Sequence, residues 1–552
     1  MRFGSFLSVL VCVGLSVIPL RTAAQTPTAP AAPPAGSVLA TDSVDEETAA
    51  EPEEPAIPAN DEEATVSDET LFHLQIAGDF DVRFNTLGSI PLTPLPREPG
   101  TTSLGQNNYV ETRLRLRMTG GFPRHHVRLV AQLDVANGVL VGDRAYGVHP
   151  AEWRRDSLLG VGGDTVCANE LSCERTYSGL RPRWLYAEWQ SRVGVLRIGQ
   201  MGFSWGLGIL SNDGDTQPVF GDPRYGDIVE RILFAGKPFG AMSPFIVAAA
   251  GDIVFNDILA NLSDGDLAFQ GVLSAFYERD QRKVGFFAAY RTQNNALDEA
   301  LKVGIFDFHG TWDFTDPSGG RVYAALEAAY IWGTTSIART ATRPVDRVRQ
   351  SMWALQIGRT SDRFDTVIEA GYTSGDSNID DGVQRRATMD GDHRIGLIMF
   401  PEVIAWESAR AAAILSSPNL VGHDARGASL LPTNGGVAGA MYLFPYLIWR
   451  PRSFVEARVG AVIARATAPV TDPSQQALYV RSVNYRGGDP MLRDLGLELD
   501  ASVLMRKSLS RIVDLVWGIE GGVFFPGNAF SDGSGGAMPT IGLARLRAGL
   551  HW

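Results

Sequence analysis

The sequence predicts an all-β fold, a transmembrane antiparallel β-barrel of about 18 strands preceded by a disordered acidic spacer. Two observations support this prediction: apolar and polar residues alternate in many segments, and the chain closes on one such segment, residues 541–552. In that segment small and apolar residues up to Trp552 share one face, whereas Arg545, Arg547 and His551 lie on the other. Such alternation places one face against an apolar medium and the other against water. A closing strand that ends on an aromatic is what outer-membrane barrels present to the barrel-assembly machinery, an expected partner together with outer-membrane lipid.

Three regions follow from composition. Residues 1–24 read as a signal peptide, with Arg2 before an apolar stretch and small residues before Gln25. Residues 25–70 contain 12 acidic residues and no Lys or Arg, and their Pro, Ala and Glu content cannot bury a core. Residues 71–552 form the expected barrel, with 50 acids against 47 bases. This organisation predicts the bacterial outer membrane, with the spacer in the periplasm. The charge pattern gives no indication of nucleic-acid binding.

The first three strands show why the barrel interior is expected to be polar. From Phe72 to Phe84, apolar residues alternate with polar ones, and the segments 110–118 and 127–135 do the same. Arginines at every second position of 113–117 are costly against a dry core but suit a wet lumen. The predicted pore-lining residues are Asp79, Asp81, Arg83, Glu111, Arg113, Arg115, Arg117, Arg128, Asp134, Arg545 and Arg547.

Sixteen further segments read as strands, which makes 19 candidates in all. They are 183–190, 193–200, 228–235, 243–250, 267–277, 282–292, 301–313, 320–333, 349–359, 364–374, 393–400, 441–449, 453–465, 494–506, 511–523 and 541–552. Bacterial single-chain barrels use an even number of strands, so one candidate is in excess, and 18 is favoured over 16. The links at 278–281 and 316–319 are expected to be short periplasmic turns. A helix predicted from Pro401 to Leu415 is interpreted as surface decoration, with a plug or gate as the alternative.

One long connection is the candidate constriction. Glycines at 199, 202, 206 and 208 allow close backbone approach, and charges of both signs follow. A loop of this kind folded into the lumen would narrow the lumen and create a transverse electric field across it. A solvated extracellular loop fits the same residues equally well. The candidate residues are Asp213, Asp215, Asp222, Arg224, Asp227, Glu230 and Arg231.

Two smaller motifs have structural interpretations. Cys167 and Cys173 are expected to form a short surface disulfide, which suits an oxidising compartment. Asp376, Asn378, Asp380 and Asp381 could bind calcium, but the spacing fits a helix–loop–helix calcium loop poorly, so an Asx-rich turn is favoured. We expect no other cofactor. The sequence shows no nucleophile elbow, phosphate loop or zinc-type histidine spacing, and we expect no enzyme.

Longer motifs carry a resemblance to known proteins. The first barrel strand, W-G-L-G-I-L-S-N-D-G-D from Trp205, A-G-Y-T-S-G-D-S-N-I-D-D-G from Ala370 and H-R-I-G-L-I-M-F-P-E-V from His393, together with the last strand, resemble a little-characterised family of large porin-like outer-membrane barrels. More remotely, the segments after Arg197 and Tyr372 resemble alginate-export-type barrels of 18 strands. The near-neutral charge of residues 71–552 argues against an acidic polysaccharide as substrate.

The sequence therefore predicts a porin-like outer-membrane channel for passive diffusion of small solutes, expected to form a homotrimer. Barrels of 16 to 18 strands are wide enough for water-filled channels. The alternatives are a structural or loop-plugged barrel and a dedicated exporter of polysaccharide or hydrophobic compounds.

Overall fold

The computed structural model describes most of the chain beyond residue 71. The described residues are 72–92, 103–104, 107–122, 125–142, 166–169, 172–174, 177–223, 226–295, 299–337, 343–379, 381–415 and 427–552. The expected signal peptide and acidic spacer lie outside these residues, so their assignments stay predictions.

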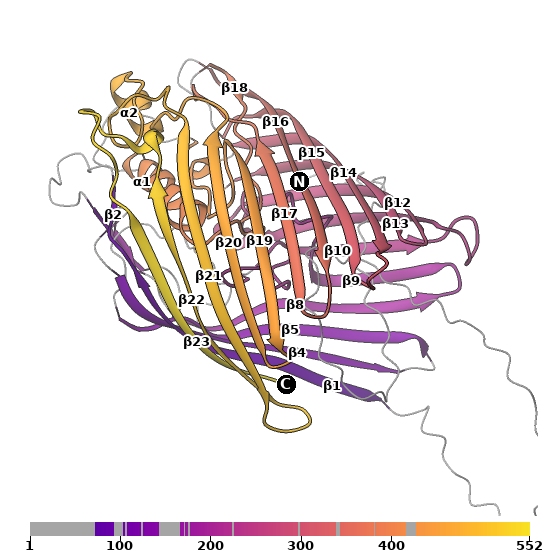
Figure 1. Ribbon diagram of the computed structural model, residues 1–552. Helices are drawn as coiled ribbons and strands as arrows, with labels where there is room; N and C mark the ends of the chain where they lie inside the picture. The colour runs from indigo at the N-terminus through magenta and orange to yellow at the C-terminus, as the bar shows by residue number, and fades with distance from the viewer. Residues whose placement is uncertain are drawn as a thin grey trace, which may run out of the picture.

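Eighteen antiparallel strands of the described chain form one closed barrel, as the sequence predicted (Figure 1). Each wall strand pairs with the next along the chain, and the last pairs with the first. The wall strands are β1 (His73–Leu87), β4 (Asn107–Phe122), β5 (Val127–Gly142), β8 (Tyr177–Ser191), β9 (Gly194–Gly202), β10 (Ile228–Gly236), β11 (Phe245–Asn256), β12 (Leu267–Arg279), β13 (Arg282–Asn294), β14 (Ala300–Thr315), β15 (Arg321–Thr335), β16 (Asp346–Thr360), β17 (Phe364–Thr373), β19 (Ala440–Arg452), β20 (Val455–Ala466), β21 (Asp494–Ser508), β22 (Asp514–Pro526) and β23 (Ile541–His551).

The remaining elements are short and lie in the connections. They are β2 (Ile90–Pro91), β3 (Ser103–Leu104), β6 (Val166–Asn169), β7 (Ser172–Glu174), β18 (Val383–Gln384), a π-helix (Met399–Ile404), α1 (Ala405–Leu415), α2 (Pro473–Tyr479) and single 3₁₀ turns at Leu262–Asp264, Ala428–Leu430 and Asn528–Phe530. None of the helices in the described residues is long and apolar enough to cross a membrane. In β6 and β7, Cys167 lies opposite Cys173 in the backbone register, and their disulfide stays a prediction.

The strand predicted at 393–400 is the one candidate that is wrong. These residues form turns and the start of the π-helix, inside the barrel. Ile395, Leu397 and Ile398 are almost completely buried. A short apolar run fits a buried strand and any other buried segment equally well, so its composition could not separate the two.

The two faces of the wall reverse the pattern of a water-soluble protein. On β1 the outward-facing Leu74, Ile76 and Phe84 are exposed, whereas the inward-facing Asp81 and Asn85 are each 1% exposed. Apolar side chains thus cover the outside, and charged side chains are buried within. Exposed apolar area on this scale indicates contact with lipid.

The connections differ in length between the two ends of the barrel. Residues 280–281 join β12 to β13 and residues 316–320 join β14 to β15, so both predicted short turns are confirmed. At the opposite end most connections are longer, and Figure 1 shows α1 and α2 gathered there.

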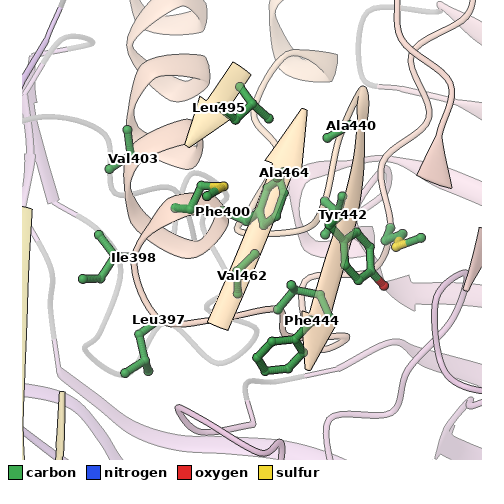
Figure 2. Close-up of a cluster of buried hydrophobic side chains, with 14 of the residues drawn as sticks. Leu397, Ile398, Phe400, Val403, Ala440, Tyr442, Phe444, Val462, Ala464 and Leu495 are labelled. Carbon is green, nitrogen blue, oxygen red and sulfur yellow. The ribbon is translucent and has the colours of Figure 1, made fainter. Parts of the chain in front are cut away.

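Two long connections fold into the barrel. We call residues 203–227 the inward loop and residues 385–415 the plug segment. Figure 2 shows Leu397, Ile398, Phe400 and Val403 of the plug segment beside Val462, Ala464, Tyr442 and Phe444 of the wall. The interpretation of the 401–415 helix as surface decoration is therefore wrong, because Trp406 of α1 is 2% exposed and Glu407 is fully buried. The apolar, alanine-rich sequence of this helix is compatible with a packed interior as well as with the protein surface.

Trp552 extends the seam that closes the barrel beyond the nine residue pairs of β1 and β23. The backbone N–H of Gly78 donates to Trp552 O at 2.8 Å, and that of Trp552 donates to Gly78 O at 2.9 Å. The indole of Trp552 covers Gly78 on the outer face, where a Cβ would lie 2.8 Å from the ring and 2.7 Å from the Arg115 carbonyl oxygen. A glycine is required here because the first and last strands meet under the tryptophan.

Substitution of Gly78 by valine should weaken this closure. We expect Gly78→Val to lower the free energy of unfolding by about 1–3 kcal/mol, the usual effect of overpacking. The matched control is Gly251→Val, because Gly251 is also on a strand but has open space where its Cβ would lie. Urea titration of both variants refolded in lipid vesicles checks this, and equal effects at the two glycines would contradict the closure role of Trp552.

Candidate pore constriction

The predicted pore-lining residues lie on the inner face of adjacent strands. Asp79, Asp81 and Arg83 belong to β1, next to β4 on one side and β23 on the other. Arg83 lies opposite Glu111 on β4 and opposite Arg547 on β23. All of the predicted pore-lining residues face inward: Asp79, Asp81, Arg83, Glu111, Arg113, Arg115, Arg117, Arg128, Asp134, Arg545 and Arg547.

Most arginines of this wall are buried in ion pairs and do not face open water as expected, whereas Arg117 and Arg128 stay partly exposed. Arg115 donates to both carboxylate oxygens of Asp134, at 2.6 and 3.0 Å. Arg113 lies 3.0 Å from Asp79, and Arg128 lies 2.8 Å from Glu188. Such charge-assisted bonds compensate the desolvation of each guanidinium. The polar pattern of the strands correctly indicated an inner charged face, but it could not show that folded-in chain covers that face.

Asp222 of the inward loop is the centre of a cluster of three arginines. Its carboxylate lies 2.8 Å from Arg83, 2.9 Å from Arg545 and 3.0 Å from Arg547. Burial alone would raise the pKa of Asp222, but the surrounding arginines outweigh it and hold the pKa well below its usual range. The neighbouring Gly221 N–H donates to Glu520 at 3.0 Å. This part of the inward loop is therefore fixed to the β1, β22 and β23 wall by charge.

Asp213 and Asp215 hold the loop to the next part of the wall. Asp215 binds Arg117 and accepts from Gln132 at 2.9 Å, and Arg117 and Arg183 keep the pKa of Asp215 low despite burial. Burial and the nearby Asp215 carboxylate raise the pKa of Asp213 to about 6. Of the two carboxyls, Asp215 is thus the permanent anion and Asp213 the group that titrates near neutral pH.

The other constriction candidates are placed differently. Asp227 accepts from the Ser211 hydroxyl at 2.8 Å, and burial together with Asp390 and Asp257 raises its pKa well above the usual range. Arg231 faces inward from β10 and binds Asp252 through two bonds of 2.6 Å. Glu230 is a correction, because strand alternation turns its side chain to the outer face of β10. Arg224 lies outside the described residues.

Carboxylates on the opposite wall hold the beginning of the inward loop, and sequence reasoning missed them. Asp307 on β14 accepts from the Trp205 indole N–H at 3.0 Å. Glu327 on β15 accepts from the backbone N–H groups of Leu207 and Ile209. Both acids are fully buried. The available signal was a carboxylate on the inward side of a short apolar stretch, as in G-I-F-D-F and A-L-E-A-A.

The plug segment is anchored by the same kind of contact. Glu498 on β21 accepts from the N–H groups of Leu397, Ile398 and Met399, at 2.5, 2.7 and 2.6 Å. His393 lies 2.9 Å from Glu369 on β17 and 3.1 Å from the Leu207 carbonyl oxygen of the inward loop. Burial alone would lower the pKa of His393, but Glu369 outweighs it and raises the pKa. The imidazole therefore joins the wall, the plug segment and the inward loop.

The candidate calcium motif forms turns at the long-loop end. Asp376 accepts from the N–H groups of Asn378 and Arg385, at 3.0 and 2.9 Å. Asp381 accepts from Val383 N–H at 3.0 Å and from the Arg385 guanidinium at 2.7 Å. Asp380 lies outside the described residues, among which no group of three potential ligands could hold a metal. The geometry is that of Asx turns.

Comparison with known proteins finds similarity only among solved structures. No protein-family model matches the sequence, and no curated protein matches it. Acinetobacter baumannii OccAB1 is 10% identical, with 86% of this chain and 96% of that chain covered and a TM-score of 0.44. Pseudomonas aeruginosa OpdK, solved with vanillate, is 10% identical over 86% and 98%, TM-score 0.46. A BenF-like porin from Pseudomonas fluorescens Pf-5 is 9% identical over 87% and 99%, TM-score 0.45. These values are too low to transfer a residue role or a solute.

Removal of the Asp222 charge should release the inward loop. Asp222→Asn leaves Arg83, Arg545 and Arg547 without their shared anion, and we expect a loss of about 3–5 kcal/mol of unfolding free energy. The control is Asp280→Asn in an exposed turn, whose pair with Arg279 at 3.8 Å contributes about 0–1 kcal/mol. Urea titration compares the two variants. A cost at Asp222 no greater than at Asp280 would show that the arginine cluster does not hold the loop.

The titration of Asp213 should make stability depend on pH. A raised pKa means that the folded chain prefers the protonated carboxyl, so Asp213 destabilises the fold progressively as pH rises from about 4 to 6. Asp213→Asn removes this effect and keeps an acceptor for the Asp215 N–H. We expect the variant to gain stability over the parent protein across this window and to keep that gain above it. Unfolding free energies measured between pH 4 and 8 test this, and a constant difference would exclude it.

Proposed function

We propose that this chain is an outer-membrane channel for passive diffusion of small solutes, narrowed by the inward loop and the plug segment. The observation that carries the proposal is the closed 18-strand barrel with an apolar outer face and a charged inner face. Only a lipid environment favours such a surface, and a barrel of this size has room for a lumen.

The same architecture supports an orientation. The short turns are proposed to face the periplasm, where the spacer of residues 25–70 would lie, and the long connections to face outward. The closing strand with Trp552 is the proposed contact for the barrel-assembly machinery. A homotrimer remains an expectation from barrel size.

Within this channel, we expect charged side chains to contact passing ions and solutes mainly along β4 and β5. The side chains of Arg117, Asp215 and Arg128 keep 36%, 25% and 21% of their surface exposed. By contrast, Phe400 of the plug segment and Phe444 and Val462 of the wall beside it are at most 1% exposed. Water and solutes therefore have their best access along β4 and β5. Charges of both signs border this route, so we propose weak rather than strong ion selectivity.

A loop-plugged barrel is the second candidate, because the interior is so fully occupied. Phe400 and Ala409 of the plug segment are completely buried, and three of its N–H groups are bound by Glu498. A barrel plugged in this way would be closed until the segment moved.

Single-channel recording of the protein in planar bilayers distinguishes the two. We expect the intact chain to give small ohmic steps, and a variant with residues 399–431 replaced by a short Gly/Ser linker to give steps several-fold larger. The plugged barrel predicts silence from the intact chain and conductance only from the shortened one.

Folding is monitored by the heat-induced mobility shift of the barrel in gel electrophoresis. Silence from both variants, with each correctly folded, would contradict the channel proposal. Equal conductance from the intact chain and the shortened variant would show that residues 399–431 do not narrow the lumen.

A further inference from the structure

Three cations gather on the outer surface of the wall near the long connections. Lys302 on β14 and Arg347 and Arg349 on β16 are all exposed. Their strand neighbours Val303 and Val348 are 4% and 3% exposed and face inward, so the three cations face outward.

Register brings these side chains into one patch. Lys302 pairs with Thr334 of β15, and Thr334 pairs with Arg347 of β16, so all three share one row across neighbouring strands. Two strand spacings separate the backbones of Lys302 and Arg347 by about 10 Å. Arg349 lies in the next row, opposite Trp332. We call Lys302, Thr334, Arg347 and Arg349 the cationic patch.

The three cations of the patch have no ion pair or side-chain hydrogen bond with any residue that the structure describes. The nearby acids are engaged elsewhere: Asp346 is 2% exposed and faces inward, and Asp381 binds Arg385 at 2.7 Å. This contrasts with the inner wall, where the arginines are paired with carboxylates. Three outward cations close together and without an internal partner indicate an external anion.

The patch lies at the edge of the apolar band. Exposed Tyr290 and Trp332 lie in the row of Arg349, and exposed Tyr330 lies one row nearer the short turns, where its ring stacks on Trp332 at 6.0 Å. On β14 the outward positions from Gly304 to Phe314 are uncharged. Those ten residue steps span roughly 34 Å along a strand, or about 25 Å across the membrane at a tilt near 45°. Lys302 is the next outward position, at the level of lipid headgroups.

We propose that the cationic patch binds the phosphate groups of a phosphorylated glycolipid in the outer leaflet, with its acyl chains along the aromatic residues below. Arginine binds phosphate through paired N–H donors, and lysine adds a point charge. Basic residues at the headgroup level attract anionic lipid. The inference rests on the proposed outer-membrane orientation but not on conduction.

The test measures binding of lipid A, the diphosphorylated glycolipid, to the full chain in detergent by native mass spectrometry and titration. The triple variant Lys302→Gln, Arg347→Gln, Arg349→Gln removes the patch. The matched control, Arg282→Gln, Arg465→Gln, Lys507→Gln, removes three exposed strand charges elsewhere. We expect one tightly bound lipid A on the parent and control proteins, and affinity lower by on the order of tenfold or more in the patch variant.

Two ligand comparisons keep the test decisive even where a variant folds poorly. Dephosphorylated lipid A should bind the parent protein at least about tenfold more weakly, because the phosphates carry the interaction. Equal binding with and without phosphates, or equal binding by patch and control variants, would overturn the proposal. Phosphatidylglycerol or free pyrophosphate binding as tightly as lipid A would also overturn it, since the patch would then be a general anion site. Cell fractionation and bilayer recording separately test location and conduction.

Discussion

Every other feature of this molecule depends on one constraint, the pairing of all wall N–H and C=O groups within a closed ring of strands. In lipid an open edge would leave those groups without partners, at a cost of several kcal/mol each. The seam between β1 and β23 removes that edge, and the hydrogen bonds of Gly78 with Trp552 continue it to the last residue. Once the ring is closed, strand alternation fixes which side chains face lipid and which face the interior.

An 18-strand ring encloses more space than its own side chains fill, and this chain fills it with two of its connections. They are held by different means on different walls. Near β1, β4 and β23, arginines bind the carboxylates of Asp215 and Asp222. Near β15 and β21, carboxylates bind backbone N–H groups, as Glu498 does for residues 397–399, and Asp307 on β14 binds the indole N–H of Trp205. Each contact satisfies a polar group that would otherwise be buried without a partner.

The sequence predicts the wall well because alternation is local information. The pattern from Phe72 to Phe84 and the even-number rule together lead to 18 strands, and placing Asp81 and Arg113 on one side of β1 and β4 requires only counting by two. Which segments fill the interior cannot be predicted from local sequence. Residues 393–400 are apolar enough for a strand, and the fact that Glu498 binds them becomes visible only when segments a hundred residues apart come together. Glu230 and Arg231, by contrast, are consecutive residues of β10, so counting by two along the predicted strand 228–235 already places them on opposite faces.

The unequal packing of the interior decides where a solute could pass. Where the plug segment packs against the wall, Phe400, Phe444 and Val462 are at most 1% exposed. Moving the plug segment away would expose this apolar surface and leave carboxylates such as Glu498 without their hydrogen-bond donors. Where the inward loop meets the arginines of β4, the side chains of Arg117 and Asp215 are already partly exposed to solvent. Movement there exchanges ion pairs for hydrated charges, whose free energies are closely balanced. For the proposed channel we therefore infer that a passage along β4 and β5 is the least costly one, and that motion of the inward loop would control it without displacing the plug segment.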